Sequence, residues 1–165
     1  MRRVVVTGMG IVSSIGNNVQ EVLESLRAAK SGVVFAEEYA AHGFRSQVKG
    51  APTLDPSTLV DRRAMRFHGG GTAWNHVAMD QAIADAGLDE SLISNERTGI
   101  IMGSGGSSTR TIVEASEKTL ESGSSKKVGP FAVPKAMSST ASASAVGDGS
   151  DTFSVSQNSV QISRA

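Results

Sequence analysis

Apolar residues recur with the spacing of one helix face in three stretches of this sequence. The first stretch is opened by Asn17 or Asn18, which suit a helix N-cap, and it is expected to end at Gly32. Its apolar residues follow at i, i+3, i+4 and i+7: Val19, Val22, Leu23 and Leu26. This pattern predicts an amphipathic helix.

Two further helices are predicted downstream. One runs from about Thr72 to Ala86, since Gly69–Gly71 would be a poor helix interior and Gly87 is a suitable C-terminal stop. Its inward face is Trp74, Val77, Ala78, Ala82 and Ile83. The other runs roughly from Thr111 to Glu121.

Short apolar runs between these helices predict strands. Val4–Val6 and Thr98–Met102 have the composition of buried strands, and Gln47–Gly50 is a weaker third segment stopped by Pro52. Val128–Pro134 is expected to be extended because it is bounded by prolines. Strands that alternate with helices predict an α/β fold.

The pattern changes at Ser138. Residues 138–165 contain nine serines, no leucine and little helical spacing. Apolar residues alternate on both sides of Gln157–Asn158: Phe153, Val155, Val160 and Ile162. Two interpretations stay open, a weak hairpin or a tail without a partner in the fold.

The glycines after the first predicted strand resemble part of a dinucleotide motif. Gly8 and Gly10 supply the first two glycines of G-x-G-x-x-G, but Ser13 replaces the third, and the variant spacing fails at Val12. In addition, ten residues separate Gly8 from the helix start at Asn18. A nucleotide-binding domain is therefore the disfavoured alternative.

The composition argues against several classes of partner and of reactive site. The formal net charge is zero and the pI is near 6.8, which predicts no general attraction to nucleic acid or membrane. No apolar run approaches the ~20 residues of a membrane span, and the cytoplasm is the expected location. Cysteine is absent, which excludes disulfides, a cysteine nucleophile and thiolate metal sites within these residues. No cofactor is expected.

The three histidines lack the spacing of a zinc site, so no metal site is expected. They are His42, His68 and His76. His76 and Asp80 share a helix face at i, i+4, which predicts a solvated pair rather than metal ligands.

Each of two polar features has both a functional interpretation and one that involves no specific function. The arginines of Asp61–Phe67 form either a solvated basic face or a docking patch for an acidic partner. The loop Gly103–Ser108 follows a predicted strand, where it would cradle a phosphate or allow a backbone or acyl chain to approach closely. No P-loop lysine accompanies it.

Residues 1 to about 143 resemble the N-terminal part of the β-ketoacyl-acyl-carrier-protein synthases, most of all the bacterial type I elongating enzymes of fatty-acid synthesis. The resemblance rests on segments in the family's order: Arg3–Asn18, Ser31–Gly32, Asp61–Arg62, Gln81–Leu88, Gly103–Gly106, Val128–Pro130 and Pro134–Met137. It implies an α/β fold that is a partial N-terminal half of a thiolase-like layered α/β/α architecture. Residues 1–143 would form this segment and residues 144–165 a divergent serine-rich tail.

The resemblance also implies a reaction and its partners. These enzymes work as homodimers, transfer an acyl chain from acyl carrier protein to a cysteine, and condense it with malonyl-carrier protein after decarboxylation. The family's cysteine should fall near residue 162, where this sequence has Val160–Ser163. Ser163 is a poor substitute because no base or nucleophile elbow accompanies it. We therefore expect no catalytic residue in this chain, and a frameshift or truncated reading frame near residue 143 would explain the divergence.

Binding positions match the family better than catalytic ones. The basic patch that docks the acidic carrier protein corresponds to Arg45, Arg62, Arg63 and Arg66, with Lys126 and Lys127 contributed across the dimer. Gly106 matches a position that lines the acyl pocket. Gly69–Gly71 departs from the family pattern. Two functional hypotheses follow, an inactive ketosynthase fragment and a non-catalytic module that binds carrier protein or interferes with dimers.

Overall fold

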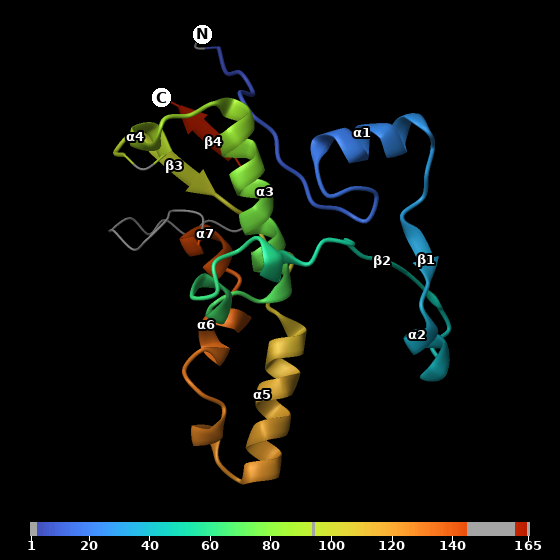
Figure 1. Cartoon of the computed structure of the whole chain (residues 1–165). Helices are drawn as coiled ribbons and strands as arrows, with labels where there is room; N and C mark the ends of the chain where they lie inside the picture. The colour runs from blue at the N-terminus through green and yellow to red at the C-terminus, as the bar shows by residue number, and fades with distance from the viewer. Residues whose placement is uncertain (1–2, 94, 145–160, 165) are drawn as a thin grey trace.

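The computed structural model describes residues 3–93, 95–144 and 161–164 (Figure 1). Its helices are α1 (Val19–Arg27), α2 (Glu37–Ala41), α3 (Gly70–Ala86), α4 (Glu90–Ile93), α5 (Thr109–Ser122), α6 (Ala132–Ala136) and α7 (Thr140–Ser144). Three short 3-10 turns accompany them: η1 (Pro56–Thr58), η2 (Ala64–Arg66) and η3 (Ser125–Lys127). The strands are β1 (Val33–Phe35), β2 (Val48–Gly50), β3 (Thr98–Ile101) and β4 (Gln161–Arg164).

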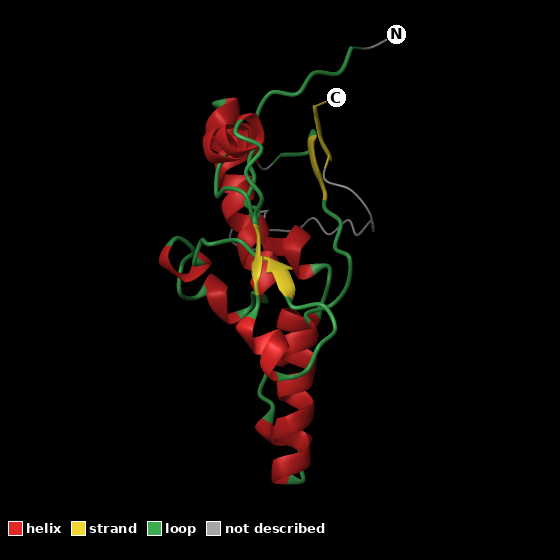
Figure 2. Ribbon diagram, turned by 90° about the vertical axis from the view of Figure 1, so that its right-hand side faces the viewer, coloured by secondary structure: helices red, strands yellow, loops and turns green. Residues whose placement is uncertain are grey.

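The four strands form two separate antiparallel pairs, seen as yellow ribbons in Figure 2. In the first, β1 pairs with β2 so that Val34 lies opposite Lys49. In the second, β3 pairs with β4 so that Gly99 lies opposite Ser163. The weak strand predicted at residues 47–50 is thus confirmed as β2, whereas β1 was not foreseen.

The core lies where α3, β3 and α7 meet. Met79, Met102 and Ala141 are its buried members, and Ile83 and Ile100 pack against them. Among the described residues no large side chain is completely buried, and Leu120 on α5 is 80% exposed. Many apolar faces predicted from the sequence therefore lack a covering element in the part of the chain that the structure describes.

The prediction of a buried strand at Val4–Val6 is wrong. These residues adopt no strand, and their side chains are 74–82% exposed. A strand forms only where a neighbouring strand satisfies its backbone, and neither of the two described sheets includes this segment. The β-branched run alone could not show whether such a neighbour was present.

The residues after Val6 instead follow the surface of α3. The Met9 N–H donates to the Asp85 carboxylate (2.9 Å), and the Ile11 N–H donates to the side-chain oxygen of Gln81 (3.1 Å). The amide of Gln81 in turn donates to the Asn17 carbonyl (2.7 Å). Two side chains of α3 therefore satisfy backbone groups that a sheet would otherwise pair.

Gly8 and Gly10 allow this close approach. A Cβ atom at Gly8 would overlap the Ala82 carbonyl oxygen of α3, and one at Gly10 would overlap the Ala78 carbonyl. The space beside both glycines is thus filled by a helix backbone. This arrangement supports packing as their role and leaves no room beside them for a dinucleotide.

The predicted helix ends are mostly confirmed. Asn18 caps α1 by accepting from the Glu21 N–H (2.9 Å), and the Glu21 carboxylate accepts from the N–H of Asn17, one residue before the N-cap (2.8 Å). Gly87 ends α3 in the left-handed conformation at φ 59°. The prediction that Gly32 ends the first helix is wrong, because α1 ends at Arg27 and the Lys30 N–H closes it onto the Ser25 carbonyl.

The prediction of an extended segment at Val128–Pro134 is also wrong, because Val128 and Phe131 have helical backbone angles and Gly129 has a φ of 84°. Ala132–Ala136 is helix α6, with Pro134 in its first turn. Proline is tolerated there because the first N–H groups of a helix have no intrahelical partner. Of the proposed C-terminal hairpin, residues 153–155 lie outside the described residues, while residues 161–164 form β4 and pair with β3.

Candidate functional site

A cavity of about 190 Å³ lies where the N-terminal ends of α3 and α5 meet the segment from α6 to α7. Gly69, Gly71 and Thr72 contribute the α3 part of its wall, and Lys135 and Met137 contribute the part from α6 and the residue that follows it. The loop from Ser104 to Ser108 completes the wall. Segments that are distant in the sequence therefore share one polar cavity.

Gly106 lies on this wall. The Ser104 hydroxyl donates to the Gly106 carbonyl (2.7 Å), which fixes the turn. A Cβ atom at Gly106 would meet nothing within 4 Å. The structure thus leaves open space at this residue, and its role in an acyl pocket stays a prediction.

Three of the predicted docking residues lie together on the turn at η2. The Asp61 carboxylate accepts from the Arg63 N–H (2.7 Å) and from the Ala64 N–H (3.4 Å), and the hydrogen bond from Arg63 is the main cause of a lowered Asp61 pKa. Arg62, Arg63 and Arg66 are exposed and make no ion pair with any described residue. The turn therefore presents three exposed guanidinium groups.

The other predicted docking residues lie on different elements. Arg45 belongs to the segment between α2 and β2, and Lys126 and Lys127 belong to η3, beyond the C-terminal end of α5. Figure 1 shows the α2–β2 arm and the far end of α5 as separate projections. Within this one chain, the structure does not bring these three residues to the arginine turn.

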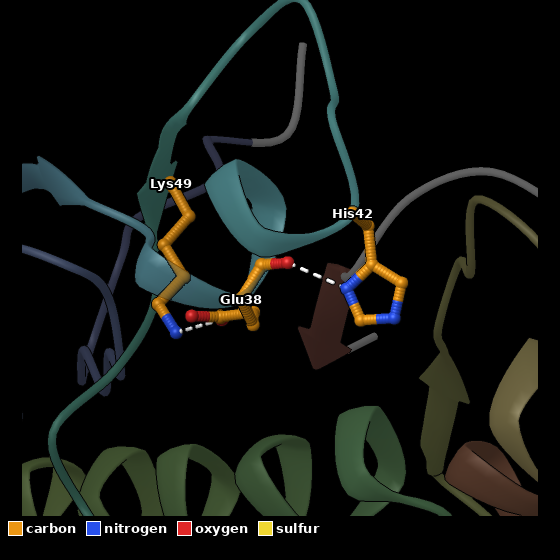
Figure 3. Close-up of polar contacts among 3 residues, drawn as sticks. All are labelled: Glu38, His42 and Lys49. Carbon is orange, nitrogen blue, oxygen red and sulfur yellow. Dashed lines mark hydrogen bonds and ion pairs between the residues drawn. The ribbon is translucent and has the colours of Figure 1, made fainter.

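The arm that carries Arg45 has its own polar contacts (Figure 3). Lys49 forms an ion pair with the Glu38 carboxylate, which lowers the pKa of Glu38 and raises the pKa of Lys49. The Nδ1 of His42 donates to the backbone oxygen of Glu38 (2.7 Å). Because Lys49 is neutralised by its partner, Arg45 is the better docking cation on this arm.

His68 and His76 form a second polar cluster, beside α3. Their ring centroids lie 5.4 Å apart, and the Nδ1 atom of each ring is buried without a hydrogen bond from any described residue. His76 Nε2 lies 3.7 Å from the Asp80 carboxylate, which confirms the predicted pair. No group of three or more potential metal ligands occurs in the described residues.

His68 is expected to destabilise the fold at acidic pH. Burial, followed by the nearby His76, lowers its pKa below the ordinary value. The unfolded state then binds a proton more readily, so stability is full above about pH 6.5 and falls as the pH decreases through the folded-state pKa. The His68→Phe variant should show a smaller loss of urea midpoint between about pH 7.5 and about pH 5.5 than the parent chain.

The exposed His42 provides the matched control for this measurement. A His42→Phe variant should keep the pH dependence of the parent chain. An unchanged pH dependence in His68→Phe would contradict the assignment. If the urea midpoint of His68→Phe is lower than that of the parent chain by the same amount at both pH values, the substitution has only removed packing contacts.

Several residues of the cavity wall cannot be recognised from the sequence. Thr72, Asn75 and Lys135 line it but come from segments that show no shared motif. The sequence does mark each of the two helix starts, at Gly69–Gly71 and at Ser108. It does not show that the two starts lie close together, because that proximity depends on the tertiary fold.

No helix in the described part of the chain is long and apolar enough to cross a membrane. Ser163, the substitute nucleophile considered above, lies in β4 opposite Gly99. The 165 residues include no cysteine.

Comparison with known proteins identifies the family. Residues 1–146 match the family described as Beta-ketoacyl synthase, N-terminal domain. The 3-oxoacyl-[acyl-carrier-protein] synthase 1 of Escherichia coli (strain K12) is 48% identical over 144 residues, which cover 87% of this chain and 36% of that protein. The enzyme of the same name from Haemophilus influenzae is 45% identical over 143 residues, which cover 87% of this chain and 35% of that protein.

A solved structure agrees with these similarities. A β-ketoacyl synthase from Burkholderia phymatum STM815 superimposes with a TM-score of 0.72 at 29% identity, covering 88% of this chain and 36% of that one. The predicted thiolase-like fold is thus confirmed, and the chain spans about a third of the length of the curated relatives that it matches. This chain belongs to the β-ketoacyl synthase family, and the part of it that matches is the family's N-terminal domain.

Proposed function

We propose that this chain provides the N-terminal domain surface of a β-ketoacyl-acyl-carrier-protein synthase and binds an acidic acyl carrier protein. Relatives at 45–48% identity are named 3-oxoacyl-[acyl-carrier-protein] synthase 1. The reaction of such an enzyme is the decarboxylating condensation of an acyl thioester with malonyl-carrier protein during fatty-acid elongation. Its cysteine nucleophile is not among these 165 residues.

The observation that supports docking is the turn at η2. Arg66 lies in the 3-10 turn η2, Arg63 is its N-cap and Arg62 precedes the cap, and none of the three has an ion-pair partner among the described residues. Guanidinium groups bind carboxylates with two parallel hydrogen bonds, and grouped cations attract an acidic helix from a distance. A zero net charge means that this attraction is local rather than general.

The remaining predicted residues extend this proposal. Arg45 adds a cation on a second element, and Lys126 and Lys127 would approach the same carrier protein from the other subunit of a homodimer. Gly106 would leave room for an acyl chain because no atom occupies the position of its side chain. The expected setting is the cytoplasm.

Titration of the purified chain with holo-acyl carrier protein tests the proposal. We expect the affinity to fall steeply between about 50 mM and about 500 mM salt, since exposed charge pairs are screened over a few ångströms at high ionic strength. Absent binding, or binding that is independent of salt, would remove the docking function.

The same preparation tests whether the chain performs the acyl-transfer step. After incubation with an acyl thioester, its intact mass should be unchanged because no cysteine is present to accept the acyl group. A stoichiometric acyl adduct would contradict the non-catalytic assignment. The full-length Escherichia coli relative serves as the positive control.

A further inference from the structure

We propose that Phe67, held in place by Phe131, is an apolar anchor beside the arginines of η2, and that this surface selects an amphipathic acidic helix over a partner that is only acidic. The inference rests on the docking function proposed above and adds the chemistry of the docking helix, which carries carboxylates around a large apolar side chain. Three features support it: the side of the turn on which Phe67 lies, its contact with Phe131, and the charges beside it.

The turn at η2 has an outer and an inner side. The outer side consists of its exposed residues: Arg62, Arg63, Arg66 and Phe67. The inner side consists of half-buried and buried residues: Ala64, Met65 and His68. The backbone is helical from Arg63 to Phe67, and the Phe67 N–H donates to the Ala64 carbonyl (2.9 Å). One helical turn therefore places Phe67 on the same side as Arg63.

Phe67 is the large apolar residue on this outer side. It is 45% exposed, whereas the next residue, His68, is only 6% exposed. The turn is thus packed on its inner side, and the exposure of Phe67 does not come from a detached segment. A partner that covers the ring removes apolar surface from water, which is favourable. Aromatic and arginine side chains together are typical of interface centres.

Phe131 fixes the position of the Phe67 ring. The two ring centroids lie 5.2 Å apart at an interplanar angle of 85°, which is the favoured edge-to-face arrangement. Phe131 is half-buried and is the N-cap of α6, where its carbonyl accepts from the Lys135 N–H (3.1 Å). Because the Phe67 ring is ordered before binding, little side-chain entropy is lost when a partner covers it.

The charges beside Phe67 define the partner. Asp61 is the one carboxylate of residues 61–67, and it accepts from the N–H groups of Arg63 and Ala64. The arginines therefore need carboxylates from a partner. A segment that is only acidic would leave Phe67 in water, and an apolar surface would leave the arginines without counter-charges. A helix with one apolar stripe between carboxylates satisfies both groups.

Two synthetic helical peptides and the full 165-residue chain test the anchor. The peptides carry the same number of glutamates and differ only at two apolar positions spaced i, i+4, which are leucine in one and alanine in the other. We expect the parent chain to bind the leucine peptide about fivefold to tenfold more tightly, because leucine buries apolar surface against Phe67. In Phe67→Ala this preference should fall below about twofold, and the affinity for the alanine peptide should stay within about twofold of the parent.

Two further variants separate binding from packing. Phe67→Met keeps an apolar side chain and should retain most of the preference for leucine. Leu26→Ala removes a side chain that is 63% exposed on α1, so it is the matched control and should keep the full preference. Loss of the preference in both Phe67 variants, together with lowered urea midpoints, would mean that Phe67 acts only in packing and would overturn the proposal.

Equal affinity of the parent chain for the two peptides would also overturn the proposal, because the arginines would then bind by charge alone. This failure is distinguishable from failure of the docking function. Salt-dependent binding of holo-acyl carrier protein without a preference for leucine keeps the docking function and removes the anchor. A preference for leucine without binding of holo-acyl carrier protein supports the anchor and removes the carrier protein as its partner.

Discussion

Replacing Gly10 by alanine is expected to destabilise the chain by at least about 2 kcal/mol and to release the N-terminal segment from α3. The added Cβ atom would overlap the Ala78 carbonyl oxygen and lie 2.8 Å from the Ala82 nitrogen. Both are backbone atoms inside a helix, which cannot move without breaking its hydrogen bonds. The cost is therefore overpacking against a rigid surface.

Urea unfolding monitored by circular dichroism measures this effect, and amide exchange locates it. The Met9 and Ile11 N–H groups should lose protection first, because their acceptors on α3 would no longer be within reach. Gly105→Ala is the matched control, since nothing lies within 4 Å of its Cβ position and its φ is not positive. Equal midpoints for the two variants would show that the segment does not pack on α3.

The same glycines illustrate how far the sequence alone could predict this fold. The three longest helices can be located from the sequence because the signals at their ends are local: Asn18 caps α1, Gly87 ends α3 and Gly123 ends α5, each within a few residues of the apolar pattern that it bounds. The shorter helices α2, α4, α6 and α7 are not predicted. A helix satisfies its own backbone. Its existence therefore depends little on distant parts of the chain.

Strands were predicted less well because their partners are distant. Val4–Val6 has the composition of a core strand, yet no described strand lies beside it. Conversely, β1 has an exposed apolar sequence without alternation and forms because Val48–Gly50 lies alongside it. Whether a β-branched run becomes a strand was decided by tertiary context that composition does not contain.

The two candidate sites also differ in how far the sequence alone predicts them. The arginine turn was recognised because Arg62, Arg63 and Arg66 are close in the sequence and a 3-10 turn keeps them close in space. The cavity was missed because its wall joins the start of α3, the start of α5 and Lys135, which are separated by tens of residues. The sequence indicates that Gly69–Gly71 is a poor helix interior and a departure from the family pattern, whereas the structure shows that its first glycine lets two helix starts touch.

Reversing the charge of the arginine turn should nearly abolish carrier-protein binding. The triple variant Arg62→Glu, Arg63→Glu and Arg66→Glu replaces three attractive charges by three repulsive ones, so we expect an affinity loss of about 100-fold or more at low salt. The fold should be unaffected because all three side chains are exposed and make no ion pair with a described residue. Titration with holo-acyl carrier protein at about 50 mM salt measures the change.

The decisive comparison holds net charge constant. A control chain with three reversals on α1 and α5 has the same total charge but an intact turn: Arg27→Glu, Arg110→Glu and Lys118→Glu. If the attraction is local to η2, the control should lose only a few-fold in affinity, which is the effect of net charge at a distance. Lysine at all three positions of the turn should restore much of the binding but less than arginine, because an ammonium group cannot bind a carboxylate bidentately. Equal losses in the two charge-reversed chains would mean that the turn is a solvated basic face and that the carrier protein responds to overall charge.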